Sequence, residues 1–158
     1  LRVSEILFDD TAATAAVNPP ARDIRYALPV SPVITMVRWA HERLQPLGGP
    51  GRARVILIEN RFVEVPLDTT SGVEGVFNID QSERYEGVLA VKVEIEGDPS
   101  GAGFVQARAS ASRTVLENYS LNQREETLFE MMAGIVTALD ERLEQEIRTN
   151  LAKWLLVS

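Results

Sequence analysis

The stretch RYEGVLAVKVEIEGDPSGAGFVQARASASRTVL, residues 84–116, decides the fold. Over residues 84–96 an extended chain places apolar side chains on one face and charged ones on the other. The apolar positions are Tyr85, Leu89, Val91, Val93 and Ile95, and the charged ones are Glu86, Lys92, Glu94 and Glu96. Residues 97–101 are turn formers, and residues 104–116 alternate again. The stretch therefore predicts a β-hairpin in a sheet with one face in water.

The second of these strands carries small side chains on its inward face, at Ala107, Ala109 and Ala111. Small residues let a helix approach closely and need bulky side chains opposite them. A C-terminal amphipathic helix supplies those side chains. Ser120 and Gln123 form a capping box at the start of this helix. Large apolar residues then recur every three or four positions, namely Leu128, Met132, Ile135, Leu139, Leu143, Ile147 and Leu151. A helix continuing to residue 154 would be ~50 Å long, so we expect its end to project from a small domain.

The N-terminal half predicts further strands and one more helix. Residues 2–8 form a first strand, residues 9–22 a loop, and residues 24–28 an extended segment. Ser31-Pro32 predicts a helix start, because a hydroxyl caps the first turn and proline fits its first position. That helix ends at the run PLGGPG, residues 46–51.

The four consecutive apolar residues 55–58 predict a strand covered on both faces, or one whose second face meets a partner. We expect it to continue to residue 65 with a bulge near residues 60–61. The order of elements predicts a single α+β domain over residues 1–158. Its core would be an antiparallel meander of about four strands, with two helices packed on one face.

Composition excludes several classes of function. The chain of 158 residues has a net charge of -7 and no dense basic cluster, so we expect no nucleic-acid binding. It has no cysteine, which excludes disulfides, thiol nucleophiles and Cys-ligated metals. No stretch approaches the ~18 apolar residues that span a bilayer.

Residues that could carry chemistry are sparse. The single histidine, His41, lies in the first helix between Ala40 and Glu42, and no motif places a nucleophile beside it. The glycine-rich run 48–51 precedes a strand rather than a helix, so it cannot offer a helix N-terminus to a phosphate. The sequence predicts no catalytic residue, no cofactor and no metal ligand.

Two apolar segments are candidates for binding a partner. The loop 68–83 carries Val76 and Phe77 near its middle. The end of the last helix contains more large apolar residues than one helical stripe holds, at Leu151, Trp154 and Leu155 among others. We expect these five side chains to contact a protein or a lipid-like molecule.

Several segments resemble small Gram-negative envelope lipoproteins, in particular uncharacterised alphaproteobacterial ones of the ABC-transport auxiliary and lipopolysaccharide-assembly kind. These segments are LPVSP at 28–32 leading to RWA at 38–40, VEVPL at 63–67, ERY at 83–85 and SRTV at 112–115. The resemblance implies a periplasmic location and a lipidated residue upstream of Leu1 that anchors the chain to the outer membrane. It implies no catalytic residues.

These observations lead to one hypothesis and two alternatives. The hypothesis is a non-enzymatic, periplasm-facing accessory domain that binds a protein partner or a lipid-like amphiphile in envelope assembly or transport. It would meet the membrane only through the upstream anchor. One alternative is a small hydrolase or isomerase that uses scattered carboxylates such as Glu64, Glu83 and Glu94. The other is a structural homo-oligomer joined through the last helix or a sheet edge.

Overall fold

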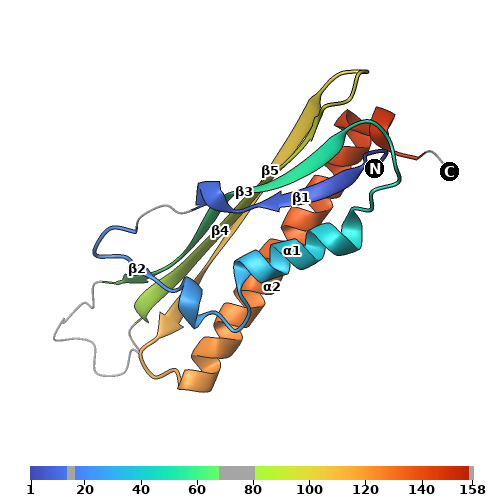
Figure 1. Cartoon of the computed structure of the whole chain (residues 1–158). Coiled ribbons are helices and arrows are strands. Elements are labelled where there is room, and N and C mark those ends of the chain that lie inside the picture. The colour runs from blue at the N-terminus through green and yellow to red at the C-terminus, as the bar shows by residue number, and fades with distance from the viewer. Residues whose placement is uncertain (14–16, 68–80, 157–158) are drawn as a thin grey trace.

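Three long strands form the body of one sheet, and two helices lie on one of its faces (Figure 1). The computed structural model describes residues 1–13, 17–67 and 81–156. The long strands are β3 (Arg52–Pro66), β4 (Gln81–Glu96) and β5 (Gly103–Leu116). They pair antiparallel as consecutive neighbours, which confirms the predicted meander. The register shifts between Leu57 and Glu59, just before the predicted position of the bulge.

The first strand differs from the prediction in its bounds and its direction. β1 (Glu5–Asp9) runs parallel to β3 opposite residues 52–56. Parallel neighbours need a long connection, usually with a helix in it. Residues 10–51 provide that connection and include helix α1 (Pro32–Arg43). The domain is α+β as predicted, but its sheet is mixed rather than wholly antiparallel.

Short elements replace the extended segment expected at residues 24–28. β2 (Arg22–Asp23) pairs antiparallel with β3, and the 3-10 helix η2 (Arg25–Ala27) follows it. The carboxylate of Asp23 accepts hydrogen bonds from the backbone N–H and the Nε of Arg25, both at 3.0 Å, and these bonds close the turn. Another 3-10 helix, η1 (Thr11–Ala13), follows β1.

The predicted capping residues begin both helices. The Ser31 side chain accepts a hydrogen bond from the Ile34 N–H at the start of α1. Helix α2 (Leu121–Asn150) starts with the complete capping box of Ser120 and Gln123, and the 3-10 helix η3 (Ala152–Trp154) follows its end. Both helices cover the same face of the sheet, as predicted (Figure 1).

Helix α2 packs on the small residues of β5, where Ala107 and Ala109 are buried. Leu139 and Leu143 of the helix are fully buried in the same core. At ~3.4 Å per residue, the 14 residues of β5 extend about 48 Å. At ~1.5 Å per residue, the 30 residues of α2 extend about 45 Å. The strand is as long as the helix, and Leu151 and Trp154 at the helix end are buried over Gly103 of β5, so the helix end does not project and the expectation that it would is wrong.

The opposite face of the sheet carries ion pairs beside partly exposed apolar side chains. Arg54 of β3 forms ion pairs with Asp9 of β1 at 2.8 Å and with Glu94 of β4 at 3.0 Å. Ile56 and Ile58 are only half-buried on this face. The apolar run 55–58 is therefore not covered on both sides within the described residues.

Candidate functional site

The end of helix α2, which the sequence singles out for partner binding, is largely part of the core. Leu151 is 0% exposed and Trp154 is 3% exposed. The Trp154 ring covers Gly103, where a Cβ would lie 2.8 Å from the ring, and its Nε1 donates to Asp98 Oδ2 at 2.9 Å. These contacts hold the end of the helix against the β4–β5 hairpin. Val76 and Phe77, the other pair of candidates, lie outside the described residues.

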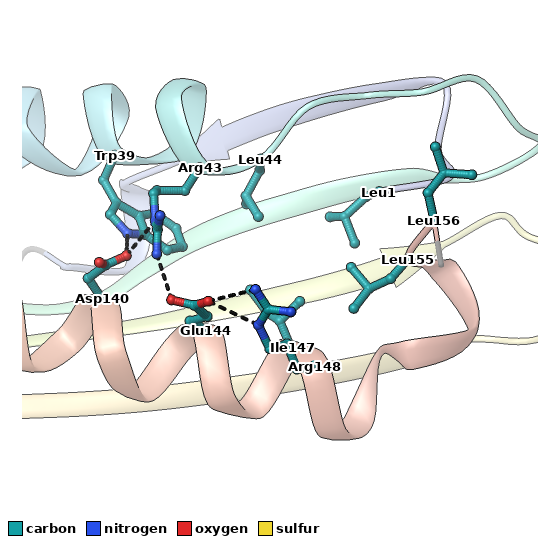
Figure 2. Close-up of a pocket in the computed structure, with 10 residues that line it drawn as sticks. All are labelled: Leu1, Trp39, Arg43, Leu44, Asp140, Glu144, Ile147, Arg148, Leu155 and Leu156. Carbon is teal, nitrogen blue, oxygen red and sulfur yellow. Dashed lines mark hydrogen bonds and ion pairs between the residues drawn. The ribbon is translucent and has the colours of Figure 1, made fainter. Parts of the chain in front are cut away.

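Leu155 is the remaining candidate, and it lines a hollow beside the ends of both helices (Figure 2). The hollow has a volume of about 230 Å³. Its apolar wall comes from segments far apart in the sequence: Leu1, Leu44, Ile147, Leu155 and Leu156. Leu156, at 63% exposed, is the most accessible of these side chains.

A chain of polar contacts forms the other wall of the hollow (Figure 2). Trp39 Nε1 and Arg43 Nε both donate to Asp140 Oδ1, at 2.7 and 2.8 Å. The same arginine reaches Glu144 Oε2 through Nη2 at 2.7 Å, and Arg148 Nε reaches Glu144 Oε1 at 2.9 Å. The network ties α1 to α2 and aligns the wall before anything is bound.

The positions of these residues follow from helical spacing. Trp39 and Arg43 are four residues apart on α1, and Asp140, Glu144 and Arg148 follow at the same interval on α2. Residues four apart share a helix face, so each set forms one ridge. The two matching ridges are visible in the sequence, but only their packing shows that they face each other.

Mutual pairing favours the charged forms of Glu144 and Arg43 in this wall. The Arg148 guanidinium, with help from Arg43, holds the pKa of Glu144 below its ordinary value. The bond to Asp140, followed by its charge, raises the pKa of Arg43. Arg43 and Glu144 are half-exposed, so the ion pairs orient side chains and add only modestly to stability.

This arrangement suits binding better than acid–base catalysis. Glu144 is held in its charged form by arginine, and Asp140 already accepts two hydrogen bonds. The carboxyl pKa values of Asp9, Asp23 and Asp98 are likewise lowered, first by hydrogen bonds from Thr11, Arg25 and Ser100. An apolar group could enter the hollow. At the edge of the hollow, the spare N–H groups of Arg148 could donate hydrogen bonds to a carbonyl or carboxylate oxygen.

The three carboxylates proposed for a hydrolase do not form one cluster, because Glu64 lies diagonally opposite Glu83 across β3 and β4 but Glu94 is remote from both. Glu83 and Glu94 are eleven positions apart on β4, or about 36 Å at ~3.3 Å per residue. Each forms an ion pair, Glu83 with Arg124 and Glu94 with Arg54, and Glu64 pairs with Arg22. His41 is exposed on α1. No group of three or more potential metal-ligating side chains forms within the described part of the chain.

Comparison with protein-family models and with curated proteins gives no match for this chain. None of the helices in the described segments is both long and apolar enough to cross a membrane.

Proposed function

We propose that the chain is a non-enzymatic binding domain, and that it captures a protein partner by receiving an apolar side chain in the hollow between the ends of α1 and α2. The observation that carries this proposal is the composition of the hollow. Its apolar wall is open at Leu156, and the opposite polar wall is already satisfied by its own contacts. An apolar anchor can therefore enter without leaving a buried charge unpaired.

The size of the hollow favours a protein partner over a lipid-like amphiphile. Pockets for small molecules usually enclose about 300–1,000 Å³. The hollow offers about 230 Å³, which suits a single large side chain. Protein interfaces concentrate binding energy in such anchors, surrounded by polar contacts that exclude water. Arg43 and Arg148 are placed to make those contacts.

The cellular setting of the proposal rests on the sequence resemblance to envelope lipoproteins. In that setting the domain would be an accessory component of envelope assembly or transport, facing the periplasm and attached to the outer membrane by an anchor upstream of Leu1. The absence of a membrane-spanning helix from the described segments is compatible with a peripheral domain of this kind.

A matched pair of variants tests the proposal. Leu156→Asp places a charge at the mouth of the hollow, and Leu121→Asp makes the same change at the start of α2, where leucine is 72% exposed. Both variants should fold, because neither side chain is part of the core. The partner that co-purifies with the unmodified chain should be retained by Leu121→Asp and lost with Leu156→Asp. Equal retention by both variants would contradict the proposal, and a lipid as the lost component would replace the protein partner by an amphiphile.

A further inference from the structure

The free edge of strand β5 is unusually long for an unpaired edge. Among the described residues β5 ends the sheet with β4 as its only neighbour, and it contains 14 residues. Most strands have only about 5–6 residues. The opposite edge of the sheet is formed instead by β1, with 5 residues, and β2, with 2. Short strands are one of the ways in which proteins protect their edges, and β5 lacks that protection.

The hydrogen bonds show which residues of β5 face outward. Phe62 O, on the outer edge of β3, accepts from Ile24 N at 3.0 Å. Alternate residues of an antiparallel strand direct both backbone groups to the same side. Phe62 is paired with Gly87 of β4, and Gly87 is paired with Ala111 of β5. Because Phe62 directs its backbone groups away from β4, Gly87 directs its own toward β5, and Ala111 directs its own back toward β4. The even-numbered residues of β5 therefore direct their backbone N–H and C=O groups away from the sheet. These residues are Phe104, Gln106, Arg108, Ser110, Ser112 and Thr114.

At two of these positions the outward carbonyl oxygen accepts a hydrogen bond from an arginine side chain. Arg142 of α2 donates to Arg108 O, and Arg113 donates to Ser112 O at 2.8 Å. The backbone N–H groups of Gln106, Ser110 and Thr114 have no hydrogen-bond acceptor among the described residues. Strand β5 contains no proline or lysine, the residues that commonly block an edge.

The charge of this edge is positive. β5 contains Arg108 and Arg113 and no acidic residue. Arg108 pairs with Glu59 at 3.0 Å, whereas Arg113 and Arg142 have no carboxylate within ion-pair distance among the described residues. A second copy of β5 would bring the same arginines together across the seam, so self-pairing is disfavoured. An acidic strand would complement them.

We propose that the free edge of β5 binds an extended acidic segment of a partner protein by β-strand addition. The backbone of the incoming segment pairs with the outward groups between Gln106 and Thr114. The backbone N–H groups of the segment replace the guanidinium groups as donors to Arg108 O and Ser112 O. The displaced guanidinium groups of Arg142 and Arg113 then donate to carboxylates of the segment. No hydrogen bond is lost in this exchange, and each arginine gains a charged acceptor, which binds more strongly than a neutral carbonyl. This site is separate from the hollow of the proposed function.

Three blocked peptides test the proposal with the full chain. One alternates glutamate with valine and threonine over eight residues, the second has lysine in place of glutamate, and the third is the acidic peptide with consecutive backbone nitrogens methylated, which blocks both of its edges. Binding is measured by NMR titration of the ¹⁵N-labelled protein. We expect the acidic peptide to shift and protect the amides of Gln106, Ser110 and Thr114. The lysine and N-methylated peptides should bind at least about tenfold more weakly.

Two variants at one position provide the matched control. Ser110→Pro removes an outward N–H at an edge, where proline is tolerated, and Ser110→Ala removes only the side chain. Binding of the acidic peptide should be lost with proline and kept with alanine.

Absence of binding by the acidic peptide would overturn the proposal. Equal binding of the acidic peptide and its N-methylated form would also overturn the proposal, because the attraction would then be electrostatic without strand pairing. This comparison of peptides uses the unmodified protein, so it does not depend on the folding of a variant. Dimerisation of the free chain in sedimentation, abolished by Ser110→Pro, would instead assign the edge to a second copy.

Discussion

Replacing Gly87 by alanine tests the packing of α2 on the sheet. Gly87 lies opposite Phe62 on β3 and opposite Ala111 on β5. An added Cβ would be 2.7 Å from Phe62 Cε1 and 2.8 Å from Ile135 Cδ1 of the helix. Optimal carbon–carbon contacts are about 3.5–4.0 Å, so both buried side chains would have to retreat by about 1 Å. The aromatic ring thus covers the glycine from the neighbouring strand, as aromatic residues do for glycines in designed sheets.

The magnitude follows from two opposing effects. Overpacking a core costs about 1–3 kcal/mol. Replacing glycine also restricts the unfolded chain, which returns about 0.4–1 kcal/mol. We therefore expect Gly87→Ala to lower the free energy of unfolding by about 1–2 kcal/mol, or the Tm by about 2–8 °C for a chain of this size. Urea unfolding followed by circular dichroism measures the midpoint and the slope.

Gly134→Ala is the matched control for this prediction. Gly134 lies within α2, and a Cβ there would have no neighbour within 4 Å. The same substitution should stabilise the helix by about 0.5–1 kcal/mol. In a double-mutant cycle, Gly87→Ala should cost less stability when Phe62 is already replaced by leucine, with a coupling of at least ~0.5 kcal/mol. A Gly87→Ala protein as stable as the unmodified chain would refute the close packing of helix and sheet.

Three further changes have expected outcomes. Leu143→Ala should lower the free energy of unfolding by about 2–5 kcal/mol in urea titrations, because it empties a fully buried site; a loss below 1 kcal/mol would be incompatible with that burial. Ser120→Ala removes the acceptor for the Gln123 N–H and should cost about 1 kcal/mol, whereas an unchanged midpoint would mean that the cap is unimportant. Arg148 lowers the pKa of Glu144 in the folded chain. The stabilisation that this ion pair gives the folded chain is therefore present above the unfolded pKa of Glu144, about 4.3. It is lost as the pH falls through the folded pKa. The difference in urea midpoint between the unmodified chain and Glu144→Gln should therefore shrink between about pH 6 and pH 3; a constant difference would argue against that pairing.

The elements with a strict period could be predicted from sequence. The β4–β5 hairpin follows from alternation at period two and from the turn residues between the strands. Helices α1 and α2 follow from their caps and from spacing near 3.6. The alanines of β5 also predicted which strand α2 covers, because only small side chains leave room for a helix at that distance.

Features that depend on long-range packing could not be predicted in this way. Nothing within residues 5–9 specifies whether their neighbour in the sheet runs parallel or antiparallel, because both ladders use the same alternation. Surplus apolar residues at the end of α2 suggested an interface. Trp154 is instead covered because Gly103 leaves space for its ring and Asp98 accepts its N–H group. Local composition cannot distinguish a core side chain from an interface side chain until the opposing surface is known.

The binding function itself is tested most directly by photocrosslinking from the mouth of the hollow. A photoreactive phenylalanine analogue is introduced at Leu156, and at Leu121 as the control, in the cells that naturally make the chain; these leucines are 63% and 72% exposed. Irradiation should join position 156 to one discrete polypeptide and leave position 121 without that product. Identical products at both positions, or none at position 156, would contradict the proposed capture of a protein partner by the hollow.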